Sequence, residues 1–161
     1  MFKSISGIPA FKRDIVLKAL APVATDLFAL AAVAKKAHVN VRGPHFVALH
    51  GLFGELYKSA GSNADRVAEY GANLGSPMAI DHKDLSASSV PGLPTDVTDG
   101  LALCSALLPS IEAVKAKVDA ACRIVSIDKG AEQILIDVSL MLGKIGWMIG
   151  AHVPEVEGAV G

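Results

Sequence analysis

The chain has 161 residues, a formal net charge of −1, a mean hydropathy of +0.45 and 5% aromatic residues. This length favours one domain over residues 1–161, and the charge gives no indication of a nucleic-acid binder. The longest uncharged stretch, 100–111, is too short to span a bilayer, and the N-terminus does not resemble a signal peptide. We therefore expect a cytoplasmic protein without a membrane segment. Its apolar content of 52% is high for a monomer, which predicts burial between subunits.

Apolar residues at helical spacing follow a short arm, residues 1–10, and predict a first helix. The helix starts at Phe11 or Val16 and runs through His38. Pro22 predicts either a kink or a later start of the helix.

A second helix follows the turn, with Pro44 at its first position and its end near Leu74. Residues 75–94 then form a long connection with one short helix at about Asp84–Ser88. On the second helix, the side chains expected to point inward are Phe46, Leu49, Leu52, Phe53, Leu56 and Tyr57.

Thr95 or Asp96 is expected to cap a third helix that reaches about Ile127. A fourth helix runs over about 131–152, and the tail from residue 154 to 161 is expected to fray. No segment shows a β-strand pattern that competes with this helical prediction. The periodicity predicts an all-α four-helix bundle, and the long connection is what a bundle with one crossover requires.

The run from His38 to Glu69 contains the candidate metal ligands. Imidazoles and carboxylates are ligands that suit iron. Asp65 and Glu69 are four residues apart, so they share one face of a helix. His50 precedes Asp65 by roughly 22 Å along a continuous helix, so one metal ion cannot touch both in one chain. Two antiparallel copies across a two-fold axis could bring the histidines of one against the acids of the other.

The same run resembles the Dps family, the mini-ferritins also called DNA-binding proteins from starved cells. The last predicted helix is similar as well, so the resemblance covers residues 15–153. The positions that match the family in the run are His38, Asn40, Gly43, Phe46, His50, Asp65 and Glu69, and those in the last helix are Lys144, Trp147, Ala151 and His152.

The resemblance implies a ferritin-like topology, a homo-oligomer of twelve subunits and Fe(II) oxidation at two-fold interfaces, preferably by hydrogen peroxide. Fe(III) would be stored as mineral in the hollow cage, which protects against oxidative damage. By the same carry-over, His38 would join Asp65 and Glu69 of a partner subunit at one iron position, and His50 would help to hold the second.

Three positions depart from the family pattern. The carboxylate expected four residues after His50 is Gly54, the Trp expected after His38 is Val39, and the expected Arg is Tyr70. The first iron position is thus complete, whereas the second has lost a ligand. This predicts slower turnover, or tight binding of only one metal ion.

The resemblance also implies pores at three-fold axes, which acidic residues line. Asp128 and Asp137 match two such positions, although both could be ordinary acids near a helix N-terminus. DNA binding in the family uses lysine-rich arms. The arm here has Lys3, with Lys12 and Arg13 at the helix start, so we expect weak or absent DNA binding.

Other interpretations of these residues stay open. Asp65 and Glu69 could form a solvated helix face, His38 could interact with a helix C-terminus, and His50 could pack in the core. The leading hypothesis is a ferroxidase that stores iron. The alternative is a cage whose degraded centre, with Gly54 and Val39, binds or stores metal with little ferroxidase activity. A third is a helical scaffold without metal, against which the intact ligand pattern argues.

Overall fold

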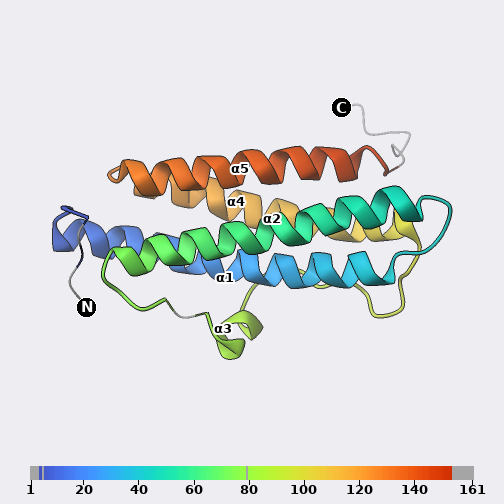
Figure 1. Ribbon diagram of the computed structural model, residues 1–161, viewed down its shortest axis with the longest axis horizontal. Helices are drawn as coiled ribbons and strands as arrows, with labels where there is room; N and C mark the ends of the chain where they lie inside the picture. Colours follow the sequence, from blue (N-terminus) through green and yellow to red (C-terminus); the bar gives the residue numbers. More distant parts are fainter. Residues whose placement is uncertain (1–3, 5, 79, 154–161) are drawn as a thin grey trace, which may run out of the picture.

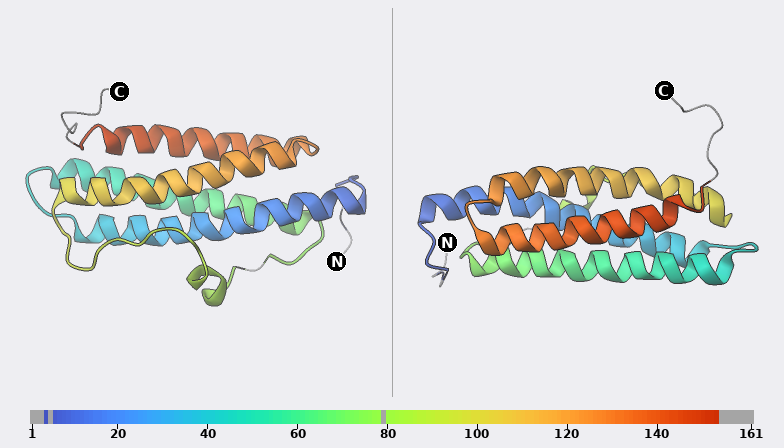
Figure 2. Two further views of the ribbon diagram at one scale, coloured as in Figure 1. Left: turned by 180° about the vertical axis from the view of Figure 1, so that it is seen from behind. Right: turned by 90° about the horizontal axis from the view of Figure 1, so that it is seen from above.

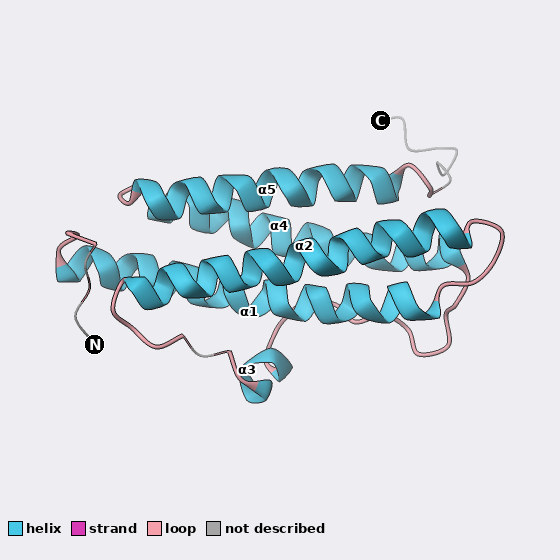
Figure 3. Cartoon of the chain, in the orientation of Figure 1, coloured by secondary structure: helices cyan, strands magenta, loops and turns pink. Residues whose placement is uncertain are grey.

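A computed structural model describes residue 4, residues 6–78 and residues 80–153, all of which form helices, turns and loops without a strand (Figures 1 and 3). Residues 1–3 and 5 of the predicted N-terminal arm, and the whole predicted frayed tail from residue 154, lie outside the described residues. The helices are α1 (Ala10–Asn40), α2 (Phe46–Asn73), α3 (His82–Ser86), α4 (Gly100–Val125) and α5 (Lys129–Gly150).

The four long helices form a bundle in which α1 contacts α2 and α4, and α5 contacts the same two helices (Figure 2). Short turns join α1 to α2 and α4 to α5. The segment that carries α3 runs back along the bundle, so α2 and α4 point in the same direction. This is the predicted bundle with one long crossover and a short helix within it.

Aliphatic side chains fill the space between the helices together with the aromatic Phe53, which is the largest fully buried side chain. The turn between α1 and α2 is fixed by Gly43, whose φ of 104° favours glycine. The Arg42 amide donates to the Thr98 carbonyl oxygen at 2.8 Å, which ties this turn to the start of α4. Other fully buried residues are Leu20, Leu27, Leu30, Leu49, Leu56, Leu74, Leu103, Leu107, Leu135 and Leu142.

Three details differ from the sequence prediction. Helix α1 contains Pro22 and begins at Ala10, so the later start is wrong. The cap of α4 is Asp99, whose side chain accepts a hydrogen bond from the Ala102 amide at 2.9 Å; the predicted cap lay too early because the chain stays non-helical through residue 98. Phe46 was expected inside but is 40% exposed, since it lies in the first turn of α2, at the rim of the bundle.

By length and apolar composition alone, α1 and α5 could each cross a membrane. The most apolar window of α1 is 56% buried inside the bundle, and that of α5 is 33% buried. Core helices of soluble bundles pass the same test, so this observation is weak evidence for a membrane span.

Candidate metal centre

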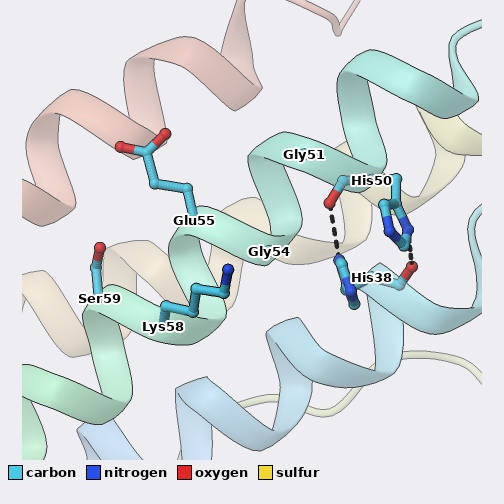
Figure 4. Close-up of a pocket in the computed structure, with 7 residues that line it drawn as sticks. All are labelled: His38, His50, Gly51, Gly54, Glu55, Lys58 and Ser59. Atoms are coloured by element: carbon cyan, nitrogen blue, oxygen red, sulfur yellow. Dashed lines mark hydrogen bonds between the residues drawn. The ribbon is translucent and has the colours of Figure 1, made fainter.

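Two histidine side chains meet where α1 ends and α2 begins (Figure 4). His38 lies in the last turn of α1, and His50 lies in the second turn of α2. Their rings are stacked, with centroids 3.8 Å apart and planes 25° apart. The ring of Phe46 packs against His50 at a centroid distance of 5.1 Å. The antiparallel pairing of the first two helices therefore unites two of the predicted ligands.

Each imidazole is held by the backbone of the other histidine. Nδ1 of His38 lies 2.8 Å from the carbonyl oxygen of His50, and Nδ1 of His50 lies 2.8 Å from the carbonyl oxygen of His38. A carbonyl oxygen only accepts, so each Nδ1 must carry the proton and donate. In the neutral rings both Nε2 atoms then keep a lone pair, as in histidines that bind metal while the other nitrogen donates to a backbone carbonyl. This donor set fits a divalent transition metal such as iron.

Gly54 lies directly beside the ring of His38. A Cβ atom at position 54 would stand 3.0 Å from Nδ1 and 3.1 Å from Cε1 of His38, which is closer than side chains normally approach. The glycine therefore does more than remove an expected carboxylate. It also leaves the space in which His38 stacks on His50.

An open hollow adjoins this histidine pair. In Figure 4 the Lys58 side chain extends along α2 toward Gly54, whereas the Glu55 carboxylate points away from both imidazoles. Because neighbouring residues on a helix are rotated by about 100°, Glu55 does not replace the missing carboxylate. The lining residues are His38, His50, Gly51, Gly54, Glu55, Lys58 and Ser59.

The two predicted acidic ligands lie farther along α2. Asp65 and Glu69 are both exposed, and neither forms an ion pair within the described part of the chain. Arg66, which could have neutralised them, instead pairs with Asp137 at 2.9 Å. Among the described residues, no three His, Cys, Asp or Glu side chains lie close enough together to hold a metal ion. Within one subunit, the predicted histidine ligands and the predicted acidic ligands are thus separated.

The profile of the ferritin-like domain matches residues 17–159. The chain belongs to the ferritin-like family. Among curated proteins it is similar to the DNA protection during starvation protein of Agrobacterium fabrum, with 27% identity over 95% of this chain and 96% of the relative. It is also 26% identical to the fine tangled pili major subunit of Haemophilus ducreyi, over 98% of this chain and 84% of that protein.

Among solved structures, a Dps from Microbacterium arborescens in its high-iron form superposes with a TM-score of 0.86. The two chains are 25% identical, over 92% of this chain and 98% of the other. The resemblance to Dps, predicted from the run between His38 and Glu69, is confirmed, and so is the ferritin-like fold with one crossover.

In this ferritin-like chain, the two acids expected at pores have partners within the subunit. Asp128 is only 4% exposed and caps α5, accepting from the amides of Gly130 and Ala131 and from the Tyr70 hydroxyl at 2.7 Å. On Asp137, hydrogen bonds from Gln133 and Arg66 lower the pKa of the carboxyl.

Sequence reasoning missed two features of this site. Lys58 was not singled out, although its position four residues after Gly54 places it on the same face of α2. The contacts between ring nitrogens and carbonyl oxygens were also missed, because they depend on how closely two helices approach rather than on any motif.

Proposed function

We propose that this ferritin-like protein oxidises Fe(II), preferably with hydrogen peroxide, at a site between two subunits. Iron is the substrate. His38 and His50 of one subunit and Asp65 and Glu69 of a second would supply its ligands. The observation that carries the proposal is the histidine pair: both Nδ1 atoms are occupied by backbone carbonyls, which leaves both Nε2 atoms free beside an open hollow.

The acidic half-site supports this arrangement. Asp65 and Glu69 are exposed, lie one helical turn apart and have no ion pair within the described residues. Exposed carboxylates without a partner are available to a second subunit. Two antiparallel copies of α2 would set each acidic half against the other copy's histidines, which makes the interface self-complementary about a two-fold axis.

The chemistry follows from the donor set. Carboxylate oxygens stabilise Fe(III) more than Fe(II), so they favour loss of the electron. Hydrogen peroxide accepts two electrons and two protons to give two water molecules, so two Fe(II) ions are oxidised for each peroxide. When the two electrons arrive together, no hydroxyl radical is released.

A hollow cage of twelve subunits would store the product as Fe(III) mineral in the cytoplasm and protect against oxidative damage, with Asp128 and Asp137 near its entry pores. Large apolar side chains support extensive contact between subunits, since several are more than two-thirds exposed in the single chain. They are Val47 at 83%, Trp147 at 73% and Leu140 at 68%. The net charge of −1 supports weak or absent DNA binding.

The first experiment follows peroxide-driven Fe(II) oxidation by the purified protein and by Glu69→Ala. The matched control is Glu112→Ala, which removes an exposed glutamate of α4 far from the α2 face. We expect rapid oxidation by the wild type and by the control, and a loss of roughly tenfold or more in Glu69→Ala. Equal rates in Glu69→Ala and the wild type would overturn the proposed ligand set.

A mixing experiment tests the site's division between subunits. His50→Ala and Glu69→Ala are each expected to have lost most of the oxidation activity alone. When subunits are dissociated and reassembled at random, half of the two-fold pairs contain one of each variant, and each such pair has one intact site. About a quarter of the wild-type sites should return. A mixture as inactive as its components would refute a site built from two subunits.

Gly54 favours a second candidate, a cage that binds or stores metal with little ferroxidase activity. The residue contributes no ligand at the position where the family pattern has a carboxylate. Oxidation no faster than in buffer, together with tight Fe(II) binding under anaerobic conditions, would select this candidate.

A further inference from the structure

Lys58 is a cationic side chain beside the position where the expected carboxylate is missing. It lines the same hollow as His38, His50 and Gly54, and its side chain extends toward Gly54 (Figure 4). The side chain is exposed and forms no ion pair within the described residues. A lysine here places a positive charge beside the position where the family pattern has the carboxylate that helps to hold a second metal ion.

The proposed contact between subunits fixes what faces Lys58. His50 precedes Gly54 by four residues, and Asp65 precedes Glu69 by the same number. An antiparallel copy that sets His50 opposite Glu69 of the second subunit therefore also sets Gly54 opposite Asp65 of that subunit. The two-fold axis then crosses α2 at the level between Ser59 and Ala60.

In this register the ammonium of Lys58, which leans toward Gly54, lies at the level of the second subunit's Asp65. A carboxylate has two oxygens, so Asp65 can bind a metal ion through one and accept from an ammonium through the other. Position 54 offers a second metal ion no ligand, and the ammonium repels it.

We propose that Lys58 weakens binding at the second metal position. Its ammonium pairs with Asp65 of the second subunit, so each site holds one metal ion tightly on the histidine side and a second Fe(II) only loosely during turnover. This inference rests on the proposed function, because it needs the same contact between two copies of α2. It assigns to Lys58 the neutralising role that a second cation has in a dinuclear site.

Anaerobic titration with Fe(II) tests the metal count. The wild type should bind one ion tightly per subunit. Lys58→Met should bind a second ion roughly tenfold more tightly than the wild type does, because a like charge has been removed. Lys58→Arg should behave as the wild type, as should the control Lys144→Met, which removes an exposed lysine of α5. Unchanged binding of the second ion in Lys58→Met would overturn the proposal.

A double-mutant cycle in the metal-free protein tests the ion pair itself. Lys58→Met and Asp65→Asn should each lower the melting temperature of the assembly, and the double variant should lose less than the two single losses together. Strictly additive losses would refute the pair even if Fe(II) oxidation proceeds. Absence of tight Fe(II) binding by the wild type would instead refute the proposed function, so the two failures are distinguishable.

Discussion

The imidazole of His38 occupies the space that a side chain at position 54 would need. A Cβ atom on Gly54 would lie 3.0 Å from Nδ1 of His38. That nitrogen is the one bound to the carbonyl oxygen of His50. A carboxylate side chain at this position would therefore conflict with the His38 ring where it stacks on His50.

Gly54→Ala is expected to destabilise the protein by about 1 kcal/mol. Alanine normally stabilises a helix interior by about 0.5–1 kcal/mol relative to glycine, but overpacking a tight contact costs about 1–3 kcal/mol. The free energy of unfolding, measured by chemical denaturation, checks the sign. The same variant should weaken Fe(II) binding, because the displaced ring of His38 loses its fixed orientation.

Gly143→Ala is the control for this prediction. Gly143 also lies within a helix, α5, and a Cβ there would meet only Lys115 Cε at an ordinary 3.6 Å. This variant should gain about 0.5–1 kcal/mol. If Gly54→Ala gains as much, the contact with His38 is not tight.

The sequence predicted the four long helices, the crossover and both histidines of the site, because helical periodicity and the His-containing run depend on local spacing. It did not predict the contact between His38 and His50 or the position of Lys58 in the same hollow. These depend on the distance and register of two packed helices. Asp99 was missed as a cap for a related reason: several polar residues precede α4, and only the path of the loop selects one.

Tyr70→Phe is expected to cost about 1.5–3 kcal/mol of stability, the usual value of a hydrogen bond to a charged group. The Tyr70 hydroxyl donates to Asp128 Oδ1 at 2.7 Å, which ties α2 to the capped start of α5. Oδ2 of Asp128 is buried and has no hydrogen-bond partner within the described residues. Without the Tyr70 hydroxyl, the carboxylate therefore keeps only the two amide donors of the helix cap. Unfolding of both proteins in denaturant measures this difference in the free energy of unfolding.

Tyr57→Phe supplies the comparison, since Tyr57 is the other tyrosine of the chain and its hydroxyl makes no hydrogen bond within the described residues. Its ring, which lies under the Lys35 ammonium at 4.5 Å, is retained in the variant. We expect a change within about 0.5 kcal/mol. Equal losses in the two variants would show that the bond to Asp128 is not what stabilises the protein.

Stability should also fall in alkali through Tyr70. Burial and the neighbouring Asp128 carboxylate raise the pKa of Tyr70 from 10.0 to about 12. The folded state thus favours the protonated phenol, so this contribution is complete below pH 10 and is lost as the pH rises toward about 12. Unfolding free energies measured across that window should decline more steeply for the wild type than for Tyr70→Phe. Parallel curves would contradict the assignment.

Asp26→Asn should loosen the crossover segment. The Asp26 side chain is only 5% exposed, pairs with Lys117 of α4 and accepts from the Ser88 hydroxyl at 2.7 Å. Removing its charge should cost about 2–3 kcal/mol, less than a fully buried pair because Lys117 can rehydrate. Hydrogen exchange should accelerate most at residues 82–93. Asp14→Asn, which breaks an exposed pair with Lys18, should change stability by less than about 0.5 kcal/mol. Exchange that stays as slow in Asp26→Asn as in this control would show that other contacts hold the crossover.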